Sequence, residues 1–241
     1  MEKIIYKNPP IILAKIDIQW RLNIGVVELN DKVENEVYAK LSQIINSPIG
    51  KTPIQEGTVS INDKEANIDT KIIGYEINFD NYKIAYTYNN FVFTILSQYI
   101  SFDTYKTILQ QTFELCGAYL DKILSINIQV VNKFDNITKG DKECDFFKIP
   151  DTLLLGIKPK TIFYRYVLED DKYIGNGISS AITVADAKPD NDLRSIVLDI
   201  IVKNTNELQC NECIDAIQKL KEIETKIFND IITDKVKHII K

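Results

Sequence analysis

The sequence has a single histidine and no glycine-rich phosphate-binding motif. These two features argue against enzymes that use a histidine as general base and against nucleotide-binding enzymes with a phosphate loop. His238 stands almost at the end of the chain, where an imidazole is poorly held for general-base chemistry. A mechanism based on a nucleophile and a histidine is therefore not expected. Neither a Walker A sequence nor a Gly-x-Gly-x-x-Gly pattern occurs, so a glycine-rich phosphate cradle is not expected either.

Cysteine is also scarce, with four residues in a chain of 241. So few cysteines do not form a disulfide framework, and they predict a reduced, cytoplasmic location. Cys210 and Cys213 have the only motif-like spacing, at the expected start of a helix whose dipole would lower a thiol pKa. A structural zinc site needs four ligands, and no second pair lies nearby. We interpret both as small residues at a helix start, with a redox dithiol or half of a zinc site as alternatives.

Long apolar runs are missing as well. No uninterrupted run approaches the roughly 18 residues that cross a bilayer, and the first residues lack the apolar core of a signal peptide. We therefore expect no membrane association. The net charge of −5, from 29 Lys+Arg and 34 Asp+Glu, argues against attraction of the whole protein to nucleic acid.

What is present is a clear alternation of strand and helix patterns. From Ile12 to Leu22 every second residue is apolar, which is typical of a strand with one buried face, so Trp20 is expected in the core. Asn30 is predicted to cap a helix that ends near Ser47. The remaining predicted strands are 70–78, 82–88, 91–98, 125–134, 161–168, 174–185 and 194–203. The remaining predicted helices are 101–123, a short one within 145–155, and 211–231.

The same order of elements occurs in both halves: a strand, a helix, three strands and a long helix. We therefore predict an α+β fold with a largely antiparallel sheet and two long helices on one face. Residues 1–124 and 125–241 are the expected halves, sharing one continuous sheet. A pseudo-twofold duplication explains this order, and an α+β sheet without internal symmetry is the alternative.

Polar residues on the wet face of the sheet are the first candidate binding surface. They include Lys15, Asp17, Gln19, Arg21, Glu76, Asn127, Gln129 and Asp199. If the strands of Asp17, Glu76 and Asp199 were neighbours, these acids could hold Mg²⁺ for a hydrolase or nuclease. Polar residues are also what the outer face of a one-sided sheet carries without any function. No metal site, cofactor or catalytic residue is assigned.

A second candidate is the basic and aromatic stretch 158–166, which contains Lys158, Lys160 and Arg165. Cations interleaved with aromatic residues can contact phosphates and stack on bases. However, half of these aromatic residues must face the core, and the acidic run 169–171 follows at once. A solvated strand end is the preferred interpretation.

Several segments resemble a sporadically distributed family of uncharacterised bacterial and archaeal proteins. The resemblance rests on 6–18, which contains Pro9-Pro10 before the first strand, on 93–99 and 131–133, and on 198–200 with the helix end 227–234. Members of that family often carry a histidine after a leucine in the last helix, whereas Lys221 follows Leu220 here. The family supplies no activity.

The sporadic distribution of that family implies loci of the defence or toxin–antitoxin type. The resemblance therefore implies a non-enzymatic interaction protein, a sensor, adaptor or neutralising partner, that binds a protein from the same operon. A nucleic-acid- or nucleotide-binding module and a divalent-metal hydrolase are the alternatives. The oligomeric state is not predicted.

Overall fold

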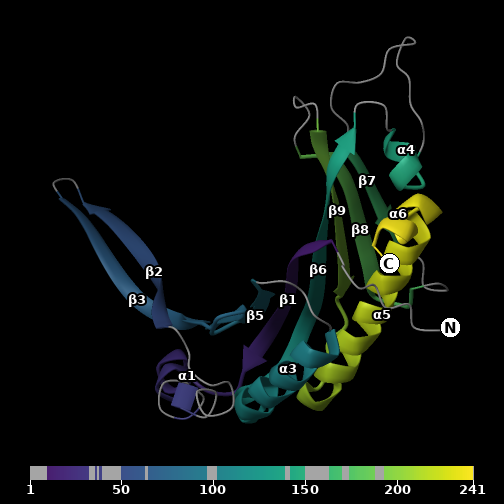
Figure 1. Ribbon diagram of the computed structural model, residues 1–241. Coiled ribbons are helices and arrows are strands. Elements are labelled where there is room, and N and C mark those ends of the chain that lie inside the picture. The colour runs from purple at the N-terminus through teal and green to yellow at the C-terminus, as the bar shows by residue number, and fades with distance from the viewer. Residues whose placement is uncertain are drawn as a thin grey trace. The chain divides into compact units, whose positions relative to one another are not determined.

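The structure is a computed structural model that describes residues 10–32, 36, 38–39, 50–62, 65–96, 102–138, 142–149, 163–169, 174–187 and 193–240 (Figure 1). Its helices are α1 (Val26–Lys32), α3 (Phe102–Cys116), α4 (Glu143–Phe146), α5 (Cys213–Ile231) and α6 (Asp234–Ile239). Its strands are β1 (Ile11–Leu22), β2 (Gly50–Asn62), β3 (Glu65–Asn78), β4 (Tyr82–Thr87), β5 (Asn90–Ile95), β6 (Leu120–Thr138), β7 (Phe163–Leu168), β8 (Ile178–Asp186) and β9 (Leu193–Asn204).

Among the described residues the strands form one nine-stranded sheet in the order β2-β3-β4-β5-β1-β6-β9-β8-β7. The pairs β2–β3, β3–β4, β4–β5, β7–β8 and β8–β9 are antiparallel. The predicted α+β class and largely antiparallel sheet are thus confirmed. The two long helices are α3, with 15 residues, and α5, with 19.

The two halves of the sequence contribute their strands to the sheet in the same order, counted outwards from the central pair β1 and β6. From β1 the neighbours are β5, β4 and β3, and from β6 they are β9, β8 and β7. This is the order that a duplicated unit of strand, helix, three strands and helix gives. The first half carries one further strand, β2, beyond β3, and the sequence interpretation did not separate this strand from its neighbour.

Several predicted element boundaries need correction. Strand β3 begins at Glu65 rather than at 70, and β8 begins at Ile178 rather than at 174. The first helix begins at Val26 rather than at Asn30. The helix predicted over 101–123 ends at Cys116, a 3₁₀ turn follows at Gly117–Tyr119, and β6 begins at Leu120. The short helix expected within 145–155 is α4, Glu143–Phe146, and residues 150–155 lie outside the described residues.

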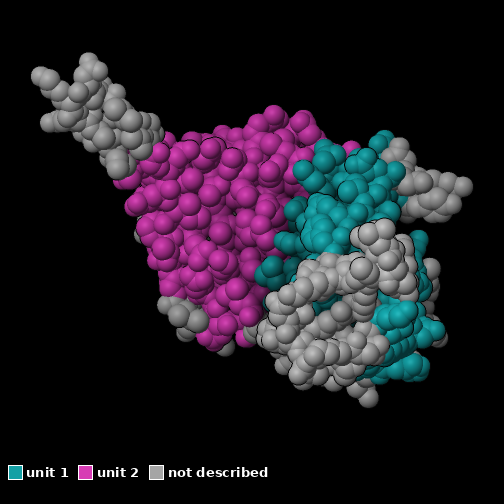
Figure 2. Space-filling view, turned by 90° about the horizontal axis from the view of Figure 1, so that it is seen from above, with its two compact units in different colours: residues 1–14, 127–205, 217–241 teal, residues 15–126, 206–216 magenta. Residues whose placement is uncertain are grey.

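The chain divides into two compact units, coloured separately in Figure 2. Unit 1 contains Met1–Ala14, Asn127–Thr205 and Ile217–Lys241, and unit 2 contains Lys15–Ile126 and Asn206–Ala216. Neither unit coincides with a half of the sequence, because β1 and β6 contribute residues to both. The division into 1–124 and 125–241 stays a prediction.

The core of unit 2 is aromatic and is built around Trp20, which is 2% exposed. Its ring lies 5.7 Å from that of Phe91 on β5 and 6.4 Å from that of Phe113 on α3. The indole N–H donates to the backbone carbonyl of Thr87 at 3.1 Å. The alternation in 12–22 therefore predicted the position of this residue correctly.

The core of unit 1 is mainly aliphatic. Leu198 and Ile200 on β9 and Val184 on β8 are fully buried, and so is Leu220 on α5. On each of these strands the next residue along lies on the other face of the sheet, since side chains alternate. Asp199 is therefore on the face turned away from this core.

Strands β2 and β3 form a long two-stranded hairpin within unit 2 (Figure 1). They pair from Gly50↔Asn78 to Asn62↔Glu65, with a register shift between Ile54 and Gln55. The next strand, β4, pairs with β3 only from Gly74 to Asn78. The part beyond the shift, Gln55–Asn62 with Glu65–Ile72, thus has no third strand among the described residues. We call this part the β-arm.

Candidate binding surface

The outer face of unit 1 carries one polar row between two apolar rows. Register places Arg165 on β7 opposite Thr183 on β8, and Thr183 opposite Asp199 on β9. Gln129 on β6 extends this row, because its side-chain amide donates to both carboxylate oxygens of Asp199 at 3.1 Å. Two of the residues predicted from the sequence, Arg165 and Asp199, therefore belong to one row, which we call the polar row.

The rows on either side contain no charge. One comprises Phe163, Ala185 and Val197, and the other comprises Val167, Ala181 and Ile201. The polar row and its neighbours thus form a mostly apolar sheet face with a cation at the β7 end.

Burial disfavours the charged form of Asp199 within this row. It raises the pKa of the Asp199 carboxyl, and this effect outweighs the hydrogen bond from Gln129 and the charge of Arg165, which both act in the opposite direction. A half-buried carboxylate with a raised pKa lowers stability at neutral pH. Perturbed carboxyl groups are frequent at functional sites and also occur in structural networks.

We expect Asp199→Asn to make the folded protein more stable than the wild type at neutral pH. The pKa of Asp199 is raised in the folded state. The protonated carboxyl therefore stabilises the fold fully below the unfolded-state pKa, and this stabilisation is lost as pH rises through the folded-state pKa. Asn does not titrate and avoids that loss. Urea unfolding between about pH 3 and pH 8 measures the difference, which should vanish at the acidic end.

Glu207→Gln is the control of opposite sign. The ion pair with Lys122 lowers the pKa of Glu207, so its contribution is present above the unfolded pKa and is lost as pH falls through the folded pKa. This variant should be the less stable one at neutral pH. A stability difference for Asp199→Asn that does not depend on pH would contradict the assigned cause.

The edge strand β7 exposes large apolar side chains beside the polar row. Phe163 is 67% exposed, Val167 60% and Leu168 40%. Strand β7 pairs with β8 and stands last in the sheet, so no described strand pairs with its other edge. Natural proteins usually protect such an edge with charges, proline or a covering element, whereas the charged residue within β7 is Arg165.

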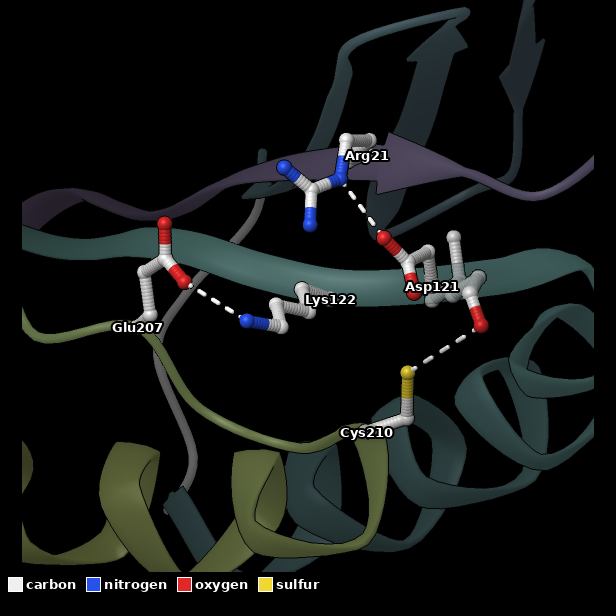
Figure 3. Close-up of polar contacts among 6 residues, drawn as sticks. Arg21, Asp121, Lys122, Glu207 and Cys210 are labelled. Carbon is white, nitrogen blue, oxygen red and sulfur yellow. Dashed lines mark hydrogen bonds and ion pairs between the residues drawn. The ribbon is translucent and has the colours of Figure 1, made fainter.

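Arg21, a further predicted site residue, lies in unit 2 and is engaged in an ion pair. Its Nε donates to Asp121 at 2.6 Å, and both side chains are about half exposed. Figure 3 shows Lys122 directed towards Glu207, at 2.9 Å, and Cys210 directed towards the carbonyl of Leu120. The Nε of Arg21 is thus engaged by Asp121, whose charge opposes the binding of an anion beside it.

The two cysteines of the short motif are not activated thiols. Burial raises the pKa of Cys210, and it raises that of the buried Cys213 far more. The redox alternative requires a lowered thiol pKa, and burial acts in the opposite direction on both thiols. Both are free thiols, and the interpretation as small residues at the start of α5 fits their surroundings.

The three acids considered for a metal centre do not meet. Strands β4 and β5 separate Glu76 on β3 from Asp17 on β1, and β6 separates β1 from Asp199 on β9. Asp17 is paired with Lys15 at 3.0 Å, and Glu76 with Lys83 at 2.9 Å. In the described part of the chain no three His, Cys, Asp or Glu side chains are grouped to hold a metal ion.

The remaining sequence candidates are only partly described. Lys158 and Lys160 lie outside the described residues, so the basic stretch is represented by Arg165 alone. His238 is exposed on α6. No described helix is both long enough and apolar enough to cross a bilayer.

Comparison with known proteins adds no family to these observations. No family model matches the chain, and no curated protein matches it significantly. The family resemblance stays an expectation.

Sequence reasoning singled out the stretch 158–166 but did not identify which side chains of β7 are exposed. Phe163, Arg165 and Val167 follow a period of two, as do Tyr164 and Tyr166 between them. That period shows that the strand has two different faces, but both contain apolar or aromatic residues. The residues on the outer face can be identified only once the register with β8 is known.

Proposed function

We propose that this chain is a non-enzymatic interaction protein that binds a partner protein through the outer face and free edge of β7. One observation carries the proposal, namely the exposure of Phe163 and Val167, which share the outer face of a strand that no described strand pairs with on its other side. Leu168, on the opposite face, is exposed as well. Large exposed apolar side chains gathered on one element are a mark of interaction sites.

The chemistry of the surface favours an extended protein segment as the ligand. An added strand would pair with the backbone groups of β7 and place alternate side chains on the outer face. There the exposed cation of Arg165 stands between Phe163 and Val167, so an apolar–acidic–apolar pattern in the partner fits the surface. Asp199 and Gln129 continue the polar row inwards and limit how far an apolar ligand can extend.

The role within a locus is part of the same proposal. The partner is a protein encoded in the same operon, and the chain acts as its sensor, adaptor or neutralising subunit in a defence or toxin–antitoxin type system. Support for this step comes from the resemblance described above. Nucleic-acid binding through Lys158, Lys160 and Arg165 is an outcome that the same experiment can distinguish.

The test is purification of the tagged protein from its native cells, with two double variants compared with the wild type. Phe163→Asp/Val167→Asp places two charges on the edge strand and should abolish recovery of a stoichiometric protein partner. Val27→Asp/Ile239→Asp is the matched control, because these side chains are 66% and 61% exposed on α1 and α6. The control should retain the partner.

Three results would count against the proposal. Repeated failure to recover a stoichiometric protein partner contradicts it, and so does equal recovery with both double variants. Recovery of nucleic acid that is released by moderate salt or nuclease supports the alternative instead.

A further inference from the structure

The β-arm has two edges that differ in charge. On its β3 side Glu65–Ile72 contains three charged residues, Glu65, Asp69 and Lys71. On its β2 side Gln55–Asn62 contains one, Glu56, and no proline. Charged residues and proline are what protect an edge strand from pairing with another chain. The β3 edge of the arm is thus the better protected one. No described strand pairs with the β2 edge, which we call the open edge.

A two-stranded arm is also a thin structure. Isolated hairpins are marginally stable in water, and three or more strands with an apolar face are needed for independent stability. The register aligns apolar residues along the arm, with Val59 opposite Ile68 and Ile61 opposite Ala66. Further strands added at the open edge would convert the arm into a broader sheet.

We infer that the open edge of β2 pairs with the same edge of a second copy of this chain, in antiparallel orientation about a twofold axis. Antiparallel pairing centred on Val59 places Val59 opposite Val59 of the second copy. It also places Thr58 opposite Ser60 and Glu56 opposite Asn62. No like charges are then placed at opposite positions of the two strands.

Other edges of the molecule fit the second copy less well. The β3 edge of the arm would bring Glu65, Asp69 and Lys71 into any pairing, and an isologous contact there can set like charges opposite each other. A twofold β2–β2 contact closes on itself, so it produces a dimer and not a fibre. Because the paired segment is short, the dimer should be weak and dependent on concentration.

Sedimentation velocity of the full chain over a wide concentration range tests this inference. The wild type should shift from monomer to dimer as concentration rises. Thr58→Lys/Ser60→Lys places lysines opposite each other in the twofold pairing and should raise the dimer Kd at least about tenfold. Asn67→Lys/Asp69→Lys is the matched control, because these residues are the β3 partners of Ser60 and Thr58 within the arm. The control should dimerise like the wild type.

Hydrogen exchange supplies a second readout that does not depend on the variants. Protection of β2 amides within Gly57–Asn62 should increase with protein concentration, while that of β3 amides in the arm should change little. A wild type that stays monomeric throughout overturns the inference, since the open edge would then serve a different partner. Equal weakening by both lysine pairs also overturns it.

Discussion

Replacing Gly74 by Ala should disconnect the base of the β-arm from the rest of unit 2. A Cβ at this position would lie 1.9 Å from the carbonyl oxygen of Tyr86, and 2.8 Å from the Cα of Thr87. Both are backbone atoms of neighbouring β4, so a side-chain rotation cannot relieve the clash. Strand β4 must move, and the Gly74↔Thr87 pairing and the hydrogen bond from Tyr88 N–H to the Ile73 carbonyl, at 3.2 Å, should be lost.

The expected cost is at least about 1–3 kcal/mol of unfolding free energy, the usual range for overpacking a filled site. Without the clash, alanine should slightly stabilise a strand, since glycine loses more conformational entropy on folding. A decrease in the unfolding free energy of Gly74→Ala would therefore indicate the clash, and an increase would indicate its absence. Urea unfolding measures the cost, and faster exchange of the Tyr88 amide locates it at the base of the arm.

Gly50→Ala provides the matched control in the same hairpin. A Cβ at Gly50 meets no atom within 4 Å. Its effect should stay within about 0.5 kcal/mol of the wild type, as for most open positions. Equal effects of the two substitutions would show that Gly74 is not closely packed against β4.

Trp20→Ala should produce the largest loss of stability among single core substitutions in unit 2. Truncating a buried tryptophan costs about 3–5 kcal/mol. Here the carbonyl of Thr87 also loses its donor, which adds a desolvation penalty of about 1–3 kcal/mol. Against a typical total of about 5–15 kcal/mol, this loss is large enough to leave much of the protein unfolded at moderate temperature.

Two further variants separate the contributions of packing and hydrogen bonding. Trp20→Phe keeps most of the ring contact with Phe91 and Phe113 but removes the N–H donor, so it should cost clearly less than the alanine variant. Val27→Ala, at a position 66% exposed, should be nearly neutral. Unfolding must be followed by circular dichroism, because Trp20 is the chain's one tryptophan. A loss below about 1 kcal/mol for Trp20→Ala would contradict its place in the core.

The sequence predicted those elements whose pattern is uninterrupted. Strand β1 follows a strict period of two, and its buried residues, including Ile18 and Trp20, are those that the period selects. Strand β2 was missed for a physical reason. Ile54 lies an odd number of residues from Val59 and Ile61, so the few apolar residues of β2 do not follow one alternation.

The end of α3 shows a different source of error. Leu120 and Ile123 continue the three- and four-residue spacing of the helix, and both are buried, but they lie on β6. Apolar spacing alone cannot distinguish a helix from a strand over so few residues. The glycine at 117, where the α-helix gives way to a 3₁₀ turn, was the available signal.

Only part of the candidate surface could have been predicted. Arg165 and Asp199 were identified individually, because a charge between apolar strand residues stands out in a sequence. Their membership of one row depends on two registers, β7 with β8 and β8 with β9, which no local pattern specifies. The same dependence explains why Asp17, Glu76 and Asp199 were grouped wrongly as a metal-site alternative.

The division into two discontinuous units has a consequence for how the chain folds during synthesis. Multidomain proteins commonly fold from the N-terminus while the ribosome is still translating. Unit 1 includes both Met1–Ala14 and Ile217–Lys241, and unit 2 takes in Asn206–Ala216. Neither unit can be completed when only the first half has emerged, because each includes a segment that follows Thr205. A nascent chain stalled near Thr205 should therefore lack the last segment of both units, and its β1 residues should exchange amide hydrogens faster than those of the released protein.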